Sequence, residues 1–449
     1  MKTKISNFKS SISLFTAVLL LLGVSIGCAS TPATPETPTT LKDAYKDYFK
    51  IGVAINRLVT TGRTDVQADN ANRTPEQLEK DIALVKEQFN AIVNENDLKP
   101  VLIHPNSGPD GYEWQYGDAF VKFGEDNDMY ITGHCLVWHS QVPGWLFQGT
   151  ETGEEATGAL ISGRAQFLAE AAPQEGARGT RGTRGGRGGG AGFGGGMFGG
   201  MRGNTGPRAT REELIERMRE HIHAVVGRYK GKVKVWDVVN EALADGGDQM
   251  LRSSQWTQII GDDFIELAFT FAHEADPDAI LRYNDYSLEN AGKRAKLKQL
   301  VKQLQDKGIP IHAIGTQTHI SASTTFEQMD QTLTDLETIG LPIHVTELDM
   351  NVSMGGRGRT SANIADNAAA TSGGLISQAD QQQSKAYADL FKALVKHKDS
   401  VDLVVFWGVC DAVSWRANGS PLLFDGEDNK KPAFDAVMNV AIEAKKNGQ

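Results

Sequence analysis

The chain has 449 residues, and its composition excludes several classes of protein. Apolar residues make up 40% of it, enough for a globular core, so the chain is not wholly disordered. Three cysteines are too few for a disulfide framework. The formal net charge of −10 argues against a nucleic-acid-binding protein, whose surface needs an excess of basic side chains.

Residues 1–27 are typical of an export signal. Three lysines lie among the first nine residues, and the apolar run Leu14–Ile26 is too short for a comfortable membrane span. Small residues then precede Cys28, a pattern that resembles a bacterial lipoprotein signal, in which the cysteine becomes lipid-modified and N-terminal. The alternative is a plain secretory signal with an incidental cysteine. We expect an exported protein, lipid-anchored through Cys28 to the cell envelope (outer membrane or cell surface).

Residues 28–40 are rich in Ser, Thr and Pro, as expected of an extended tether between a lipid and a folded domain. From residue 41 the sequence changes character, and we place one large domain at 41–445. The two remaining cysteines, Cys135 and Cys410, lie in apolar runs, which favours buried free thiols over a disulfide bridge.

The domain repeats one unit, a short apolar run ending in polar residues and then an amphipathic helical pattern. The apolar runs are Ile51–Asn56, Asn90–Asn94, Met129–Trp138, Val233–Asn240, Ala279–Asn284, Ile311–His319, Leu341–Glu347 and Val401–Trp407. The helical stretches include Thr74–Gln88, Glu212–Tyr229, Asp262–Ala275, Lys293–Lys307, Phe326–Ile339 and Gln378–Lys396. Eight such units predict an α/β fold, a (β/α)8 TIM barrel. We favour the barrel over an open doubly wound sheet because the Gly-rich phosphate turn typical of that sheet is absent.

Two long loops follow predicted strands. The third βα loop holds an insertion at about 150–209, in which Arg178–Gly206 is nearly pure Gly and Arg and lacks the apolar residues needed to fold alone. Its Arg-Gly repeats resemble RNA-binding boxes, but the acidic domain and the export signal favour an exposed flexible loop. A second loop, Asn351–Gly374, follows strand seven. Both belong on the C-terminal face of a barrel, where active sites are built.

Two glutamates end the fourth and seventh strands. One glutamate in such a place can equally well form a structural ion pair, but Glu241 and Glu347 on opposite sides of a barrel favour an acid/base pair. Strict alternation of side chains along a strand puts Glu241 on the same face as Asp237 and Val239, and Glu347 on the same face as Val345.

Histidine, glutamine and tryptophan gather near these carboxylates. Gln317 and His319 end strand six, and His134 and Trp138 end strand three. A single histidine in such a place is more often a satisfied core residue, and scattered tryptophans are usually core. Flat aromatic faces beside hydroxyl-binding groups nevertheless indicate a carbohydrate cleft. The tryptophans considered for it beyond Trp138 are Trp145, Trp407 and Trp415.

Metal and cofactor signatures are missing from the sequence. There is no cysteine cluster and no HExxH, and His221 and His223 lie two apart on a helical pattern and so face different directions. No GxSxG elbow suggests a serine hydrolase. We expect no metal and no cofactor.

Seven blocks, in order along the chain, closely resemble glycoside hydrolase family 10, the endo-1,4-β-xylanases. They are Phe89–Pro100, Gly133–Gln141, Trp236–Ala242, Tyr283–Tyr286, Gly315–His319, Val345–Asp349 and Phe406–Trp415 with Phe424–Asp425. The resemblance implies a (β/α)8 barrel, xylan and xylo-oligosaccharides as binding partners, and retaining hydrolysis of β-1,4-xylosidic bonds. We also expect a monomer that does not bind nucleic acid.

The resemblance assigns roles residue by residue. Glu241 matches the family's acid/base and Glu347 its nucleophile. Asn240 would bind the 2-hydroxyl of the sugar next to the cleaved bond, His319 would hold Glu347, and Gln317 would line the same subsite. The residues matching the next subsite on the non-reducing side are Glu95, Asn96 and Lys99, with His134 and Trp138 beside them and Trp407 and Trp415 as floor and wall of the cleft.

Two other functions remain open at this point. A barrel hydrolase could act on another β-1,4-glycan, such as cellulose or mixed-linkage glucan. A glycan-binding lipoprotein that has lost its activity would lack one of the two carboxylates, and both are present.

Overall fold

A computed structural model of the chain describes residues 38–68, 72–149, 207–352 and 377–448. These residues belong to the compact unit Pro38–Gln449. The expected signal peptide, Cys28 and most of the expected tether lie outside the described residues. So do nearly all of the Gly/Arg-rich insertion and most of the loop after strand seven.

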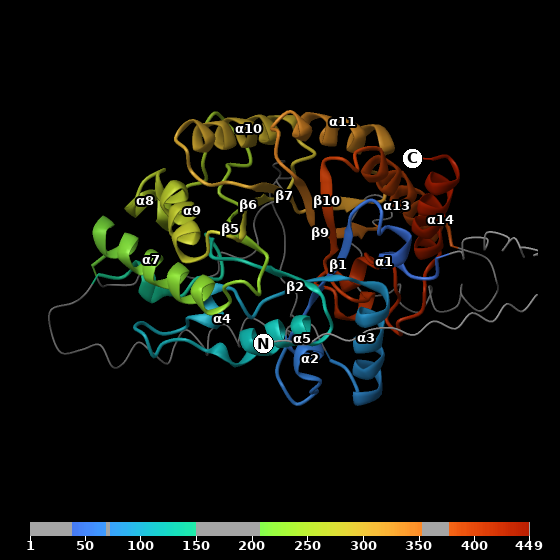
Figure 1. The fold of residues 1–449 in the computed structure, drawn as a ribbon, viewed down its shortest axis with the longest axis horizontal. Coiled ribbons are helices and arrows are strands. Elements are labelled where there is room, and N and C mark those ends of the chain that lie inside the picture. Colours follow the sequence, from blue (N-terminus) through green and yellow to red (C-terminus); the bar gives the residue numbers. More distant parts are fainter. Residues whose placement is uncertain (1–37, 69–71, 150–206, 353–376, 449) are drawn as a thin grey trace, which may run out of the picture. The chain divides into compact units, whose positions relative to one another are not determined.

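Parallel strands close into a barrel, as the sequence predicted (Figure 1). The order is β10-β1-β2-β3-β5-β6-β7-β9, and pairing of β9 with β10 closes the ring. Two short strands extend it, β4 along β5 and β8 along β9. The strands are β1 (Lys50–Ile55), β2 (Ala91–Asn94), β3 (Tyr130–Gly133), β4 (Val137–Trp138), β5 (Val235–Asn240), β6 (Ile280–Asp285), β7 (Ala313–Thr316), β8 (His319–Ser321), β9 (Ile343–Asn351) and β10 (Val401–Phe406).

Two of the eight predicted strands are interrupted. The third divides into β3 and β4, and the sixth into β7 and β8. Thr318, between β7 and β8, has a left-handed backbone with φ of 60°. The interruptions take His134 and Gln317 out of the regular ladder at the carboxyl end of the barrel. The continuous runs predicted there were therefore too long.

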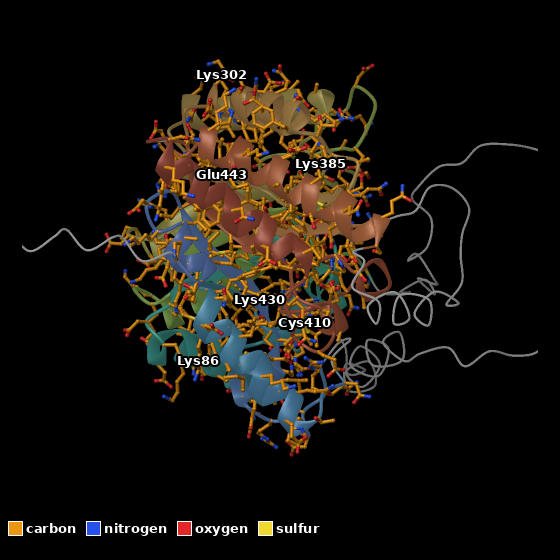
Figure 2. The ribbon with its side chains drawn as sticks, turned by 90° about the vertical axis from the view of Figure 1, so that its right-hand side faces the viewer. Lys86, Lys302, Lys385, Cys410, Lys430 and Glu443 are labelled. Atoms are coloured by element: carbon orange, nitrogen blue, oxygen red, sulfur yellow. The ribbon has the colours of Figure 1, made fainter. Side chains whose placement is uncertain are left out.

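Helices surround the barrel, and the six stretches that the sequence predicted are among them, each to within about two residues. The helices are α1 (Leu41–Ala44), α2 (Arg57–Thr61), α3 (Pro75–Gln88), α4 (Pro100–Ile103), α5 (Trp114–Asp126), α7 (Arg211–Arg228), α8 (Gln255–Ile259), α9 (Phe264–Ala275), α10 (Ala291–Asp306), α11 (Phe326–Glu337), α13 (Gln378–Lys396) and α14 (Pro432–Lys446). Thr74 caps α3 in a capping box with Gln77, as its sequence indicates. Figure 2 shows charged side chains such as Lys302, Lys385 and Glu443 on the outer helices.

Apolar side chains form two clusters in the described residues. The larger lies between strands and helices, where the rings of Phe391 and Phe406 stack 6.1 Å apart. The smaller contains Ala54, Ala91, Val93, Leu403, Val405 and Trp407. A Cβ added to Gly52 of β1 would lie 3.0 Å from Val405 and 3.1 Å from Ala91, so neighbouring strands need a small residue there.

Cys135 and Cys410 are both buried and free, which confirms the prediction of free thiols. Among the described residues, no helix is both long enough and apolar enough to cross a membrane. The described flanks of the insertion lie together: Gln148 and Arg208 form an antiparallel bridge, and the Gly149 amide donates to the Pro207 carbonyl at 2.7 Å.

Candidate active site

Glu241 follows β5 at the carboxyl end of the barrel, and each of its side-chain oxygens accepts one hydrogen bond. The Trp138 indole Nε1 donates to Oε2 at 2.9 Å, and the Gln317 amide Nε2 donates to Oε1 at 2.9 Å. These donors come from the ends of the two interrupted strands, so residues from three strands converge on one carboxyl group. All three were predicted as site residues.

Glu347 lies in β9 and is 6% exposed. The Asn284 amide Nδ2 lies 2.8 Å from its Oε1, and the His319 Nε2 lies 3.2 Å from its Oε2. On the other side of the ring, His319 Nδ1 is 3.0 Å from the fully buried Asp349. The imidazole therefore lies between two carboxylates, and the predicted contact of His319 with Glu347 is present.

Amide side chains link the two glutamates. Asn284 Nδ2, which donates to Glu347, also lies 2.9 Å from Asn240 Oδ1. Gln317 Nε2, which donates to Glu241, lies 3.4 Å from the same Asn240 oxygen. Asn284 was not predicted as a site residue. Its position near the end of β6, within the block Tyr283–Tyr286 that resembles the family, could have indicated it.

The surroundings shift the two carboxyl groups in opposite directions. Burial and the negative charge of Glu347 raise the pKa of Glu241, against the hydrogen bond from Gln317. Burial alone would also raise the pKa of Glu347, but its hydrogen bond with His319 and electrostatic interactions with His134 and His319 outweigh it and lower that pKa. One carboxyl is thus suited to hold a proton while the other is ionised.

His319 is the main cause of this asymmetry. Burial would lower the pKa of its imidazole, but the hydrogen bonds and charges of Asp349 and Glu347 raise it to about 9. At neutral pH the ring is therefore an imidazolium, hydrogen-bonded to Glu347 through Nε2 and ion-paired with Asp349 through Nδ1.

A buried ion network lies beneath the glutamates. Asp237 accepts from His134 at 3.0 Å and from Arg282 at 2.7 Å, and Arg282 also lies 2.9 Å from Nδ1 of His344. Burial opposes ionisation of Asp237, but Arg282 and His134 hold its pKa at about 2. Burial lowers the pKa of His344, so its neutral ring accepts from Arg282.

The residues predicted for the neighbouring sugar subsite also lie together. The Lys99 ammonium donates to Asn96 at 2.8 Å and lies 5.3 Å from the centre of a Trp138 ring. His134 packs edge-on against Trp407 at 5.3 Å. Glu95 directly precedes Asn96 after β2 and is 7% exposed. This group offers amide, ammonium and carboxylate groups beside aromatic faces.

Trp415 and Trp145 differ in position. Trp415 is 49% exposed, the largest exposure of a big apolar side chain in the described residues, and its Nε1 donates to Asp349 at 2.7 Å. Its ring lies 5.1 Å from His319, so it borders the site. Trp145 instead donates to the backbone oxygen of His104 and packs edge-on against the His104 imidazole, so its described contacts lie away from the carboxylates.

The prediction that side chains alternate strictly between the two faces of a strand was wrong for two valines. Val239 and Val345 belong to the cluster that packs against helices, while Glu241 and Glu347 point into the site. The pairing register shifts between Asp237 and Val239, and again where β9 meets β10. Such irregularities reset the alternation of a strand, which a period of two cannot foresee.

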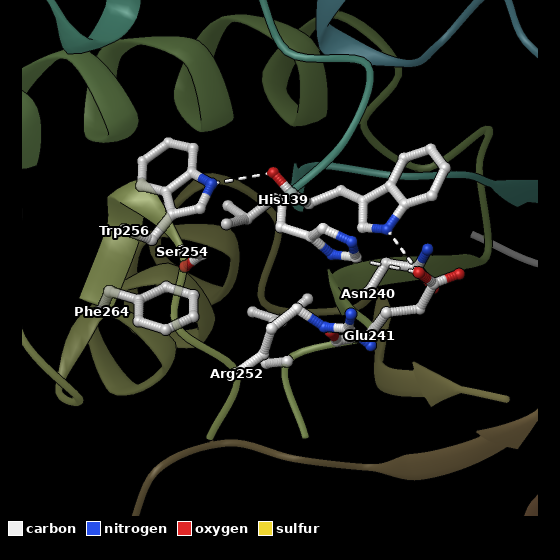
Figure 3. Close-up of a pocket in the computed structure, with 11 residues that line it drawn as sticks. His139, Asn240, Glu241, Arg252, Ser254, Trp256 and Phe264 are labelled. Carbon is white, nitrogen blue, oxygen red and sulfur yellow. Dashed lines mark hydrogen bonds and ion pairs between the residues drawn. The ribbon is translucent and has the colours of Figure 1, made fainter. Parts of the chain in front are cut away.

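A pocket adjoins Glu241 on the side of the loop that follows β5 (Figure 3). His139, Arg252 and Trp256 line it together with Glu241. His139 Nδ1 lies 4.0 Å from Glu241 Oε2, and burial with the charge of Arg252 lowers the pKa of His139 to about 4. Neither His139 nor Arg252 was predicted as a site residue.

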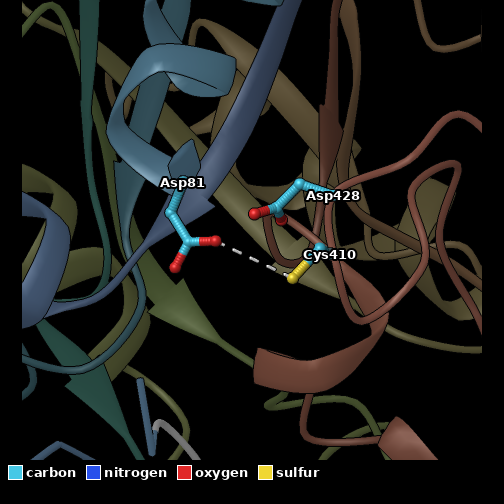
Figure 4. Close-up of side chains that lie close together, drawn as sticks. All are labelled: Asp81, Cys410 and Asp428. Atoms are coloured by element: carbon cyan, nitrogen blue, oxygen red, sulfur yellow. Dashed lines mark hydrogen bonds between the residues drawn. The ribbon is translucent and has the colours of Figure 1, made fainter. Parts of the chain in front are cut away.

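One group of side chains in the described residues has the donors for a metal ion, namely Asp81, Cys410 and Asp428 (Figure 4). The guanidinium of Arg73 lies among them, with Nε 2.9 Å from Asp81 Oδ2 and Nη2 3.0 Å from Asp428 Oδ2. Arg73 also donates to the Gly426 carbonyl at 2.8 Å. The cation that balances these acids is thus an arginine, and the group is a structural ion cluster.

Comparison with known proteins agrees with this geometry. The profile of glycosyl hydrolase family 10 matches residues 40–166 and 202–440. A β-1,4-xylanase of Dictyoglomus thermophilum is 33% identical over 434 residues, 95% of this chain and 98% of that protein. Endo-1,4-β-xylanase A of a Caldicellulosiruptor species is 34% identical over 408 residues, 90% of this chain. The chain spans about half, 48%, of that longer relative.

Solved structures give the same result. A family 10 endoxylanase retrieved from a sugarcane soil metagenome superposes with a TM-score of 0.69 at 31% identity, covering 90% of this chain and all of that one. The intracellular xylanase of Thermoanaerobacterium saccharolyticum, as a glutamate-to-alanine mutant in complex with xylotetraose, superposes with a TM-score of 0.64 at 31% identity, covering 90% and 99%. A closed parallel barrel with paired glutamates at its carboxyl end, matched over most of its length in both sequence and structure, places the chain in glycosyl hydrolase family 10.

Proposed function

We propose that the protein is an endo-1,4-β-xylanase that cleaves xylan with retention of anomeric configuration, with Glu347 as nucleophile and Glu241 as acid/base. The observation that carries the proposal is the pair of carboxyl groups linked through amides, whose pKa values are shifted in opposite directions. A retaining glycosidase needs one carboxylate to attack and one carboxylic acid to protonate the leaving oxygen.

In the first step the ionised Glu347 attacks the anomeric carbon and forms a covalent glycosyl ester. Glu241 gives its proton to the departing sugar oxygen as the bond breaks. His319 and Asn284 orient the attacking carboxylate through its two oxygens. Gln317 and Trp138 fix the acid in the same way.

The second step reverses the role of Glu241. Forming the ester removes the negative charge of Glu347, and that charge is one cause of the raised pKa of Glu241. The pKa of Glu241 then falls, so its carboxylate can take a proton from water, which attacks the anomeric carbon from the side the leaving group vacated. Two inversions give net retention.

Purified xylan and purified glucans test the substrate class. We expect rapid release of xylo-oligosaccharides from xylan and little product from cellulose or mixed-linkage glucan under the same conditions. Faster hydrolysis of a glucan would favour a hydrolase that acts on another β-1,4-glycan. No product from any of these polysaccharides would favour a glycan-binding protein without activity. The names of the relatives favour xylan.

We further propose that the mature protein is lipid-anchored through Cys28 at the cell envelope. The support is the short apolar run with small residues before this cysteine. Two acyl chains anchor a protein stably, since each buried CH₂ contributes about 0.8 kcal/mol. Metabolic labelling with a fatty acid should mark the wild type and not Cys28→Ala. An unlabelled wild type with a different N-terminus would refute the anchor and leave the enzymatic proposal intact.

A further inference from the structure

The backbone of Glu241 has an unusual conformation. Its φ of 57° lies in the left-handed region, which residues other than glycine seldom adopt. The surrounding structure must hold such a conformation in place. Since the direction of the side chain depends on the backbone, the groups that bind this backbone also set the position of the carboxyl group.

Neighbouring strands hold the backbone of Glu241 on one side. Its amide donates to the carbonyl of Asn284 at 2.9 Å. The next amide, that of Ala242, donates to the hydroxyl of Tyr283 at 2.9 Å. Tyr283 is fully buried, and its hydroxyl donates in turn to Asp285 at 2.6 Å.

Arg252 holds the other side. Its Nε donates to the carbonyl oxygen of Glu241 at 3.2 Å, and its backbone amide donates to the carbonyl of Ala242 at 2.8 Å. The guanidinium lies beside Glu241 in the pocket (Figure 3). The neighbouring strands pair the amide of Glu241 but not its carbonyl oxygen, and the side chain of Arg252 binds that oxygen.

The guanidinium is itself held from the opposite edge. Its Nη2 donates to the Tyr286 hydroxyl at 2.5 Å and lies 3.1 Å from Asp245 Oδ2. Asp245 also pairs with Lys293 at 2.9 Å, and the Lys293 side chain is 2% exposed. An arginine can bind on both edges at once because its planar fork presents several donors, whereas a lysine ammonium can replace only one contact.

We propose that Arg252 is a positioning residue that holds the acid/base Glu241 in its catalytic conformation by binding its backbone carbonyl. This inference rests on the proposed function. Without the guanidinium the backbone at residue 241 can relax from the left-handed conformation, and the carboxyl group moves from its bonds with Gln317 and Trp138. Acid and base assistance then fail together, while the nucleophile keeps its place.

The test measures turnover of Arg252→Lys and Arg252→Met in the full chain. On xylan, we expect kcat to fall on the order of tenfold to a hundredfold with little change in KM, because a displaced general acid loses much of its contribution. An aryl xylobioside with a good leaving group needs no acid, so only its deglycosylation should be slow. Sodium azide attacks the glycosyl ester without a base, so it should accelerate both variants on this substrate and yield a β-xylobiosyl azide.

Arg217→Met is the matched control. Arg217 also binds backbone carbonyls, those of Trp145, Leu146 and Gln148, but these lie away from Glu241 in the chain and belong to the loop after β4. This control should show the wild-type response to azide. Tyr286→Phe removes one group that holds the Arg252 guanidinium and should give a smaller loss of kcat with the same azide response, even if the Arg252 variants fail to fold.

Equal losses on both substrates with no azide response, in folded Arg252 variants or in Tyr286→Phe, would overturn the positioning role, as would unchanged kcat on xylan. The proposed function is tested separately in the same assay. A wild type that is inactive on xylan, or a Glu241→Ala variant that azide does not accelerate on the aryl substrate, would contradict that function itself.

Discussion

Glu241 and Glu347 carry the same functional group, but their neighbours differ in charge. Neutral donors, the indole of Trp138 and the amide of Gln317, bind Glu241. Glu347 is bound by an amide and by the charged ring of His319. At Glu241 the neutral donors do not outweigh desolvation and the negative charge of Glu347, whereas at Glu347 the hydrogen bond and charge of His319 help to outweigh desolvation, which explains the opposite pKa shifts.

The two roles predict different mutants. Glu347→Ala should abolish turnover of all substrates because the covalent step always needs a nucleophile. Glu241→Ala should keep partial activity on aryl xylosides with good leaving groups, since these need no acid. Steady-state rates on one aryl xyloside and on xylan check this. Equal residual activity of the two variants on the aryl substrate would reject the assignment.

His319→Gln should change the pH dependence at its acidic end. Glu347 must be ionised to attack, so activity falls as the pH drops through its pKa. Loss of the imidazolium raises that pKa, and the acidic limb of kcat/KM should move to higher pH. The basic limb, set by Glu241, should move less than the acidic limb, because His319 is not among the main causes of the raised pKa of Glu241.

His397→Gln serves as the control for that shift. His397 also lies between two carboxylates, those of Asp330 and Glu337, but on the outer helices. Its loss should leave both limbs of the profile unchanged. An acidic limb that does not move in His319→Gln would show that the imidazolium does not control the nucleophile.

At the scale of elements, the sequence indicated the strands better than their irregularities. Eight apolar runs predict eight parallel strands because buried parallel strands are apolar on both faces. Two breaks and the register shifts of the β5–β6 and β9–β10 pairings then decide which side chains reach the site. Arg252 and Asn284 were missed because their importance lies in contacts between distant segments, which spacing along one segment does not show.

The Arg73 cluster ties the segment before α3 to the loop after β10 and gives a prediction on stability. Arg73→Met leaves Asp81 and Asp428 facing each other without a cation, and both are at most 7% exposed. Breaking a buried pair in this way costs about 3–5 kcal/mol. Asp428→Asn keeps the Arg73–Asp81 pair and should cost less than about 1 kcal/mol, the range of an ordinary hydrogen bond.

Denaturant unfolding at pH 7 and pH 5 checks both values. The pKa of Asp428 is raised to about 6 by burial and by Asp81, so acid protonates it first. Protonation removes uncompensated charge, and the deficit of Arg73→Met should therefore shrink at pH 5. A deficit that grows at pH 5, or a costlier Asp428→Asn, would contradict the ion cluster.

At the scale of the whole molecule, the family profile skips residues 167–201, within the Gly/Arg-rich insertion. The described flanks of the insertion meet through the pairing of Gln148 with Arg208, so the barrel closes without spanning a gap at this loop. The composition of the insertion indicates a segment unable to fold by itself. It does not indicate where the segment lies on the barrel, because a segment without apolar periodicity specifies no packing partner.

Deletion of Gly176–Gly206 should leave the barrel folded and active on soluble xylan. The segment has few apolar side chains to bury, so its removal takes away few native contacts. Thermal unfolding should show a fall in Tm of less than about 5 °C. A larger fall would mean that the segment packs on the barrel.

The central claim is that Glu347 forms a covalent bond with a xylosyl unit. Its most direct test is incubation with an activated 2-deoxy-2-fluoro-β-xylobioside. The fluorine slows both formation and hydrolysis of the glycosyl ester, but the good leaving group speeds formation again. The ester therefore accumulates. Mass spectrometry of the intact protein and of its peptides should show one added fluoroxylobiosyl group, on Glu347. An unlabelled protein that still hydrolyses xylan, or a label on Glu241 or any other residue, would contradict the mechanism.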